Sequence, residues 1–133
     1  MNSIPENFLD LLKDETKAFA FLATLMSDGT PQVTPIWFNT EGEYILINSA
    51  KGRVKDRNMR ARPFIALCIK DPSNPYRYMQ IRGKIVEITQ EGADEHIDTI
   101  TYKYIGKDKY PYRQPGEQRV RYKVQISKVD AHG

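Results

Sequence analysis

Six short segments of strand-like sequence, most of them joined by turns too short to hold a helix, constrain the fold more than any other feature. The segments are Phe19–Leu25, Pro31–Asn39, Tyr44–Ser49, Phe64–Ile69, Arg77–Ile88 and Val120–Ser127. Strands joined by short turns run antiparallel, whereas a doubly wound sheet needs a helix after almost every strand. The pattern therefore predicts a mainly β fold, a small six-stranded antiparallel barrel. At 133 residues, we expect residues 1–133 to form a single domain.

Three details of these segments predict how the strands lie. The segment Phe19–Leu25 is apolar at nearly every position, which predicts a strand buried on both faces. Pro35 has no N–H group, so the second strand should bulge there or leave that position out of its hydrogen bonding. The apolar phase of the fifth segment shifts near Gly83, which is typical of a strand that bends around a barrel corner.

Three helical stretches accompany the strands. Ser3–Glu6 has the spacing of a capping box, which predicts a short N-terminal helix. Gly52–Arg60, rich in lysine and arginine, predicts a short surface helix. Glu91–Ile105 predicts an amphipathic helix that Gly106 ends, with His96 on its surface. We therefore expect two or three short helices.

Residues for several kinds of chemistry are scarce. The histidines are His96 and His132, and Cys68 is the single cysteine, so we predict no metal site and no histidine-activated nucleophile. No two glycines are two residues apart, which excludes a dinucleotide fingerprint. The longest uncharged apolar stretch, Ala18–Ser27, is about half of a membrane-spanning helix, and no signal peptide is visible. We expect a cytoplasmic protein without a membrane partner.

The net charge of +3 is unevenly distributed. Lys51–Arg62 holds six basic residues against Asp56 alone, a local +5 that leaves −2 for the rest of the chain. A glycine, Gly52, stands between a strand end and a helix start, so free backbone N–H groups, with Arg53 and Lys55, would hold a phosphate. A solvated helix face is one alternative. Nucleic-acid binding is another, disfavoured by the short basic stretch and the acidic remainder.

The segment Gln32–Trp37 predicts contact with a planar heterocycle. A strand interrupted at Pro35 exposes N–H and C=O groups that suit the polar edge of such a ring, and Gln32 and Thr34 add hydrogen-bonding groups. The alternative, which the residues alone favour, is a barrel bulge beside a core tryptophan, Trp37.

In order and spacing, these segments resemble the pyridoxamine 5'-phosphate oxidase-like split β-barrel family. The likeness extends from about Leu12 to Val129. The motifs that carry it are Leu22-Ala23-Thr24, Asp28-Gly29, Pro31–Phe38, Lys51-Gly52-Arg53 with Lys55, Arg57 and Asn58, and Tyr78 through Gly83. Within the family, the chain most resembles the small, single-domain reductases that depend on the deazaflavin coenzyme F420.

The resemblance implies a split barrel that forms a homodimer, with two cofactor sites at the subunit interface. It implies that the cofactor phosphate is held by Arg53 and Lys55 and flanked by Ser49 and Lys51. It implies that the ring is bordered by Gln32, Val33, Thr34, Pro35, Ile47 and Asn48. The partner subunit would approach through Tyr76–Gln80, which brings Tyr78 to the cofactor. The implied cofactor is F420, with FMN as the alternative, and the basic segment suits the several glutamates that extend from F420.

The activity implied is transfer of a hydride between the cofactor and a small conjugated organic substrate. Because the cofactor supplies the chemistry, no catalytic residue is assigned, and a water or a tyrosine hydroxyl would serve as proton donor. The alternative is a non-catalytic flavin- or haem-binding carrier or sensor. Members that oxidise pyridoxamine phosphate carry a longer C-terminal region than this chain, so vitamin B6 oxidase activity is not expected.

Overall fold

The computed structural model describes every residue from Met1 to Gly133. Two short 3-10 helices, η1 (Glu6–Leu12) and η2 (Asp14–Thr16), precede the sheet. The strands are β1 (Ala20–Leu25), β2 (Pro31–Ile36), β3 (Phe38–Glu41), β4 (Tyr44–Ala50), β5 (Phe64–Asp71), β6 (Asn74–Thr89) and β7 (Arg119–His132). Two α-helices, α1 (Val54–Ala61) and α2 (Ala93–Ile105), precede β5 and β7 respectively.

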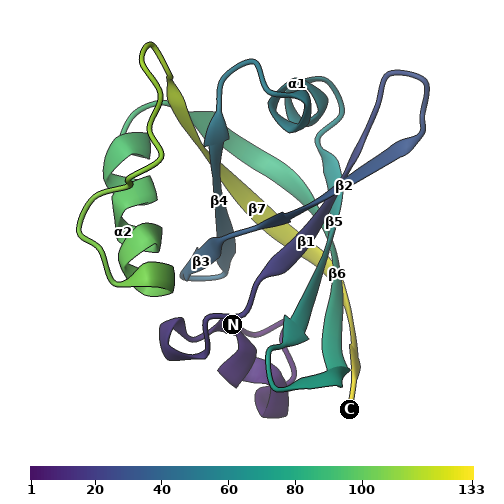
Figure 1. Ribbon diagram of the computed structural model, residues 1–133. Helices are drawn as coiled ribbons and strands as arrows, with labels where there is room; N and C mark the ends of the chain where they lie inside the picture. The colour runs from purple at the N-terminus through teal and green to yellow at the C-terminus, as the bar shows by residue number, and fades with distance from the viewer.

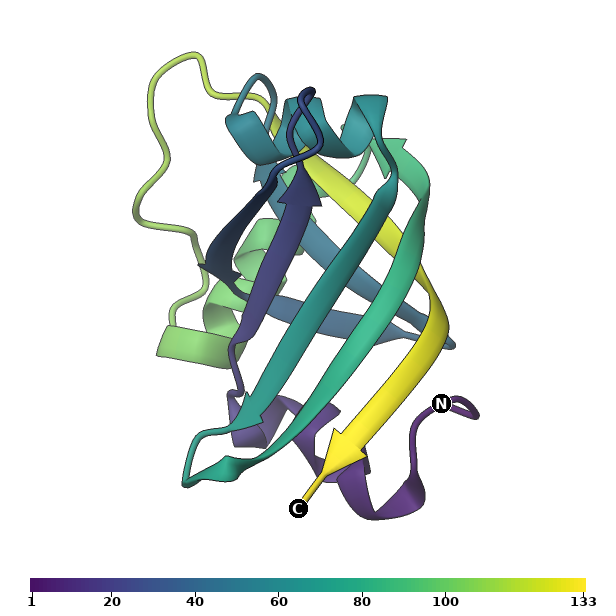
Figure 2. The same ribbon diagram turned by 90° about the vertical axis from the view of Figure 1, so that its right-hand side faces the viewer.

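All seven strands form one antiparallel sheet in the order β2-β1-β5-β6-β7-β4-β3. The strands β2 and β3 lie at opposite edges of this sheet, although only Trp37 separates them in the chain. The sheet therefore curls into a barrel whose two edges are joined by the chain itself (Figures 1 and 2). This confirms the predicted split barrel. It has seven strands rather than six because the predicted strand Pro31–Asn39 is divided at Trp37.

The structure confirms the predictions for Pro35 and Gly83. β2 keeps its register across Pro35, which pairs with Phe21 without a bulge. Because β2 is an edge strand, alternate N–H positions face away from β1, and a proline is tolerated there. The register of β6 against β7 shifts between Arg82 and Gly83. A Cβ atom at Gly83 would lie 2.7 Å from the backbone oxygen of Gln125, so a larger residue would force the strands apart.

The prediction that the first strand is buried on both faces is wrong. Ala20, Leu22 and Thr24 point into the barrel and are buried, but Phe19 and Phe21 are 46% and 38% exposed. No helix covers the outer side of β1, β5 and β6, as Figure 2 shows. The apolar side chains on that side meet solvent in a single chain. A strand with one uncovered apolar face has the same sequence pattern as a strand buried on both.

The interior of the barrel is filled with large apolar side chains. Leu22, Phe38, Ile47, Ile81 and Tyr122 are each at most 1% exposed. A barrel of this size that is packed with side chains has no room for a tricyclic ring. Any such ligand binds outside the barrel.

Helices close both ends and one side of the barrel. α1 lies over one end, η1 and η2 lie under the other, and α2 packs against β4 and β7 (Figure 1). The N-terminal helix begins at Glu6 without a side-chain cap, so the predicted capping box at Ser3 does not form. α1 begins at Val54 rather than Gly52, with Arg53 at its N-cap. No helix has both the length and the apolar character needed to span a membrane.

Candidate functional site

Hydrogen bonds to its backbone N–H groups fix the loop that joins β4 to α1, residues 51–53. The N–H groups of Lys51, Gly52 and Arg53 donate to protein oxygen atoms at 2.8, 2.9 and 3.3 Å. Gly52 has a φ of 91°, a left-handed conformation that favours glycine. The expectation that this anion loop offers free backbone N–H groups is therefore wrong. An anion here must be held by side chains and by the first turn of α1.

Asp56 anchors the anion loop from within the protein and is 1% exposed. Its carboxylate accepts hydrogen bonds from the Gly52 N–H group (2.9 Å), the Arg60 Nε–H group (3.0 Å) and the Tyr122 hydroxyl. Burial and the bond to Asp56 raise the pKa of Tyr122, which keeps its hydroxyl a donor. The one acid of the basic segment is thus committed to structure and does not neutralise Lys55.

Two cations beside the anion loop share one carboxylate, and a third cation, Lys55, lies close enough to feel their charges. Glu117 pairs with Arg53 (3.3 Å) and with Arg119, whereas Lys55 makes no side-chain hydrogen bond or ion pair. Burial, aided by the charges of Arg53 and Arg119, lowers the pKa of Lys55. An unpaired ammonium among like charges carries a cost that a bound anion would remove. The residues present therefore fit a phosphate.

Two buried hydroxyl groups lack a hydrogen-bond partner. They are Oγ1 of Thr34 on β2 and Oγ of Ser49 near the end of β4, and the one other unpaired buried side-chain atom is Nε of Arg121. An unpaired buried polar atom costs about 1–3 kcal/mol. Both hydroxyls belong to residues predicted to border the cofactor, but they lie on the inward faces of their strands, since Thr34 pairs with Leu22 and Ser49 shares a strand face with Ile47.

A chain of hydrogen bonds ties α1 to β2. Asn58 Nδ2 donates to Thr24 Oγ1 (3.0 Å), which donates to Gln32 Oε1 (3.2 Å). Arg62 reinforces the chain by donating to Asn58 Oδ1 (3.2 Å). Sequence reasoning assigned no role to Thr24 or Asn58, although a polar residue in an otherwise apolar strand was an available signal. The two residues hold Gln32 in a fixed relation to α1.

Most of the predicted site residues fall into two connected groups. The residues predicted to hold the phosphate lie where β4 meets α1, and we call this set of residues the phosphate group: Ser49, Lys51, Arg53 and Lys55. The ring group, along β2, comprises Gln32, Val33, Thr34 and Pro35. The hydrogen-bond chain through Thr24 connects the strand of the ring group to the helix that carries Lys55.

The other three predicted residues lie apart from these groups. Ile47 points into the barrel core and is fully buried. Asn48 points to the opposite side of β4, where it bonds to α2. Tyr78 lies toward the end of β6 away from α1, and its ring stacks on His132 with 5.0 Å between centroids. Tyr78 and the anion loop of the same chain therefore lie at opposite ends of the barrel.

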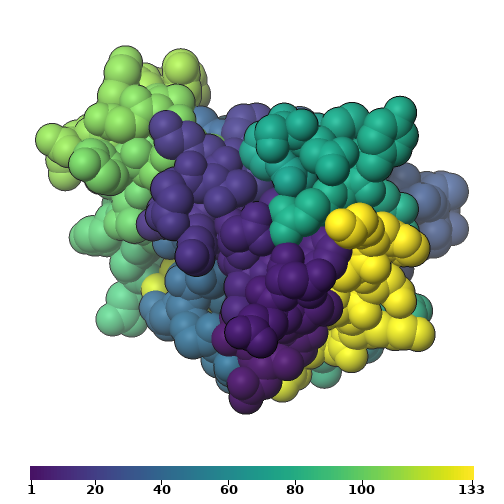
Figure 3. Space-filling model, turned by 90° about the horizontal axis from the view of Figure 1, so that it is seen from below, coloured from purple at the N-terminus to yellow at the C-terminus, as the bar shows by residue number.

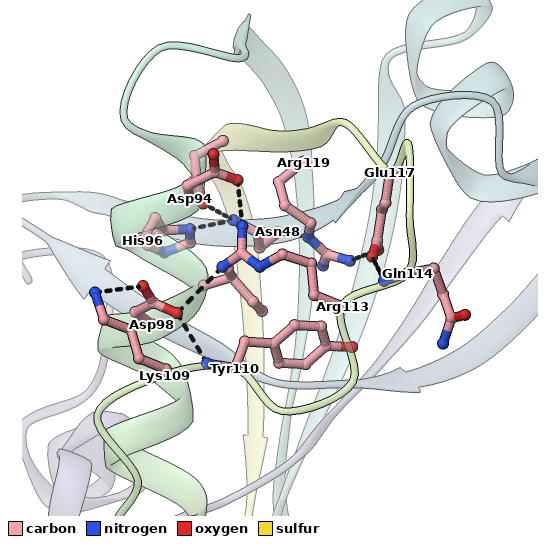
Figure 4. Close-up of polar contacts among 12 residues, drawn as sticks. Asn48, Asp94, His96, Asp98, Lys109, Tyr110, Arg113, Gln114, Glu117 and Arg119 are labelled. Carbon is pink, nitrogen blue, oxygen red and sulfur yellow. Dashed lines mark hydrogen bonds and ion pairs between the residues drawn. The ribbon is translucent and has the colours of Figure 1, made fainter.

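Asn48 is the centre of a buried network between β4, α2 and β7 (Figure 4). Its Nδ2 donates to Ala93 O (2.9 Å) and to His96 Nδ1 (3.0 Å), and its Oδ1 accepts from Arg119 Nε (2.9 Å). His96 Nε2 donates to Asn39 Oδ1 (2.8 Å). Burial, with two nearby arginine charges, lowers the pKa of His96 to about 4, so the ring is neutral. The prediction of a surface histidine is wrong.

The loop over residues 107–118 is fastened to α2 and leads to this network (Figure 4). Arg113 pairs with Asp94 (2.8 Å) and with Asp98 (3.3 Å) on α2. Glu117, near the end of the loop, is the carboxylate that pairs with Arg53. The loop thereby sets the position of a cation at the anion site.

The outer face of the sheet carries an open cavity of about 590 Å³. Its lining includes Ala23, Leu25, Pro31, Phe64 and Ala66, from β1, β2 and β5. The cavity adjoins the ring group because Ala23 pairs with Val33 of β2. A cavity of this size and apolar character suits a small-molecule ligand or a partner surface.

The fold and the site together define a split β-barrel protein with a cluster of cations at a strand–helix junction and an apolar outer face. Residues 4–133 match the family described as pyridoxamine 5'-phosphate oxidase, and the chain belongs to this family. No curated protein matches it.

Solved structures agree with this assignment. One described as an F420 reductase is 32% identical, with a TM-score of 0.82 over 96% of this chain and 98% of its own. A candidate pyridoxamine 5'-phosphate oxidase from Listeria innocua is 19% identical, with a TM-score of 0.68 over 95% of each chain. HupZ from Group A Streptococcus is 17% identical, with a TM-score of 0.68 over 96% of this chain and 93% of its own. The last two likenesses concern the fold alone.

Proposed function

We propose that this protein is an oxidoreductase that binds F420 and transfers a hydride between this cofactor and a small conjugated organic substrate. One observation carries the proposal: an unpaired lysine, Lys55, stands among cations at the strand–helix junction of a chain that is 32% identical to an F420 reductase. FMN is the alternative cofactor, since the site would accept its phosphate as well.

The phosphate would be held by Arg53 and Lys55, with Ser49 and Lys51 beside them. Glu117 orients Arg53 before any ligand arrives. Such preorganisation lowers the cost of binding, because the side chain need not be ordered again. Lys55, which has no partner of its own, supplies the charge that the ligand neutralises.

The ring would lie along the outer edge of β2. Pro31, Val33 and Pro35 share one orientation in this edge strand, and the two prolines have no N–H group. Val33 therefore offers the one outward N–H group between them, and it is available to a carbonyl or ring nitrogen at the polar edge of the cofactor. The two prolines therefore limit the positions along β2 at which the polar edge of the cofactor ring can bind.

The cofactor would supply hydride transfer at its deazaflavin ring, and the protein orients the ring and leaves one face open. Burial raises the pKa of both Tyr104 and Tyr122. The Tyr104 hydroxyl already donates to Ala18 O (2.6 Å), and that of Tyr122 donates to Asp56. Neither buried tyrosine is suited to donate a proton to a substrate, so the donor would be water or the hydroxyl of a more exposed tyrosine.

A second copy of the chain would complete the site. Val33 is 65% exposed and Phe64 is 61% exposed on the outer face, where Phe21 also meets solvent. Contiguous apolar surface of this kind marks an interaction site. The partner copy would approach through Tyr76–Gln80, whose first residue, Tyr76, is largely exposed.

The test has two stages. The purified protein is first titrated separately with F420 and with FMN, and affinity is measured by cofactor fluorescence. The rate at which the reduced complex is reoxidised by a panel of enones and quinones is then compared with that of free cofactor. We expect tight F420 binding and accelerated reoxidation. Tight FMN binding without F420 binding would overturn the cofactor assignment, and binding without acceleration would favour a non-catalytic carrier.

A further inference from the structure

A second cavity, of about 300 Å³, lies at the end of β1 and β5 away from α1. Its lining consists of Lys17, Phe19, Phe21, Lys70 and Pro72. Viewed from this end, the segment that leads into β1 lies beside the β5–β6 turn (Figure 3). None of these residues belongs to the phosphate or ring group. Its volume falls at the lower end of the range for small-molecule sites.

One wall of this cavity is aromatic and fixed in place. Phe19 and Phe21 are both partly open to solvent, as described above. The ring of Phe19 packs edge-on against Tyr104, with 5.3 Å between centroids and 72° between planes. An aromatic wall whose orientation is set by its own packing suits a flat ring rather than a flexible chain.

The other side of the cavity is positive and has no internal counter-charge. Neither Lys17 nor Lys70 forms an ion pair, and the Lys70 ammonium has only a long contact of 3.4 Å to Asp71 O. The Asp71 carboxylate is committed to Arg77 (3.0 Å) and to Ser73 N–H (2.8 Å). Those hydrogen bonds hold the pKa of Asp71 at about 2. Two ammonium groups thus remain available for an anion.

The backbone at Lys17 is fixed because this residue is the C-cap of η2, where its N–H group donates to Asp14 O. Lys17 has φ 54° and ψ 35°, and it is the one non-glycine residue with a positive φ. A residue with a Cβ atom in this left-handed conformation costs roughly 1–2 kcal/mol, which glycine would avoid. Helices commonly end on a residue in this conformation. The Lys17 side chain therefore leaves the end of η2 from a defined backbone position.

We propose that this Lys17–Lys70 cavity binds a planar organic carboxylate. The carboxylate lies between the two ammonium groups, and the aromatic body lies against Phe19 and Phe21. Because Phe21 pairs with Pro35 of β2, the apolar end of the ligand points toward the strand assigned to the cofactor ring. The identification of this ligand as the substrate rests on the proposed function, whereas the binding itself does not.

The first test uses two flat ligands of the same shape, 2-naphthoate and its neutral amide, 2-naphthamide. Each is titrated into the full-length protein without cofactor, and binding is followed by amide chemical shifts and by ligand fluorescence. We expect the carboxylate to bind about tenfold more tightly than the amide, since a charge-assisted contact at a partly exposed site is worth about that factor. Equal affinities, or no binding of 2-naphthoate, would overturn the proposal.

A variant that removes both charges gives the second test. Lys17→Asn with Lys70→Gln should weaken 2-naphthoate about tenfold and leave 2-naphthamide unchanged. Asparagine is chosen at position 17 because it tolerates the left-handed conformation. The matched control removes two exposed lysines outside the cavity, Lys13→Gln with Lys107→Gln, and should bind like the wild type. Wild-type affinity for 2-naphthoate in the folded cavity variant would contradict the proposal.

F420 titrations separate this proposal from the proposed function. The cavity variant should bind F420 like the wild type, because its substitutions lie outside the phosphate and ring groups. Naphthoate binding by a protein that binds neither F420 nor FMN would leave the cavity in place and overturn the proposed function. F420 binding without naphthoate binding would overturn the proposal for the cavity and leave the proposed function in place.

Discussion

The anion loop and the outer face of the sheet differ in how far one chain completes them. In the loop, the backbone N–H groups are bonded and Asp56 fixes the turn from the core. On the outer face, Phe21, Val33 and Phe64 have no covering layer. One chain therefore preorganises the basic strand–helix junction by itself, whereas the outer face stays uncovered and, under the proposed function, would be completed by a ligand and a second chain.

The largest expected effect comes from breaking the anchor of the loop. Asp56→Asn should lower the free energy of unfolding by about 3 kcal/mol, because a charged acceptor for Tyr122, Gly52 and Arg60 is lost in a buried position. Urea denaturation measures the change. Arg60→Ala, which removes the partly exposed partner, should cost less than about 1 kcal/mol. Equal effects would show that the loop is not anchored from within.

The next effect tests whether the outer face is an interface. Val33→Asp with Phe64→Asp should raise the dissociation constant of the proposed dimer about a hundredfold, since charges would be buried at its centre. Sedimentation over a range of concentrations measures it. Val86→Asp, an exposed apolar position outside the cavity, is the control and should leave the dimer intact. A monomeric wild type would remove the contrast between the two regions.

The buried network behind the loop should respond to pH. The pKa of His96 is about 4 in the folded protein, below the 6.5 of a free histidine. The unfolded state therefore binds more protons between these values, so stability falls as pH is lowered through this window. The loss between pH 6.5 and about pH 5 should be about 2 kcal/mol. His96→Gln should flatten this dependence, whereas His132→Gln, at the exposed C-terminal end, should retain it.

The smallest effect sharpens the contrast at the anion site itself. Lys55→Met keeps the length of the side chain and removes the ammonium that Arg53 and Arg119 repel. The variant should be more stable than the wild type by less than about 1 kcal/mol, as thermal unfolding would show. At the same time it should bind cofactor more weakly. A destabilised Lys55→Met would mean that an unrecognised partner already pairs with Lys55.

The sequence predicted much of the fold because strand periodicity and turn residues are local signals. The hairpins, the bend at Gly83 and the tolerance of Pro35 all follow from such signals. The strand break at Trp37 could not be predicted from local signals, because it depends on the curvature of the closed sheet. The exposed face of β1 could not be predicted either, since the sequence pattern of an apolar strand face is the same whether its own chain or a partner covers it.

Long-range pairing explains what the sequence left hidden in the site. His96 is buried because Asn48 and Asn39, 48 and 57 residues away, supply both of its hydrogen-bond partners. No pattern of neighbouring residues in the sequence predicts these two hydrogen-bond partners. The basic residues could be recognised in the sequence. Only the fold shows that Asp56 faces the core and leaves Lys55 unpaired.

The proposed function depends on Lys55 and Arg53 to hold the phosphate of a redox cofactor. The most direct test compares F420 affinity in the wild type, in Arg53→Ala with Lys55→Ala, and in the charge-matched control Lys13→Ala with Lys107→Ala. We expect at least about a hundredfold loss of F420 affinity in the Arg53→Ala, Lys55→Ala variant only, with its unfolding free energy within about 1 kcal/mol of the wild type. Unchanged F420 affinity in that folded variant would contradict it.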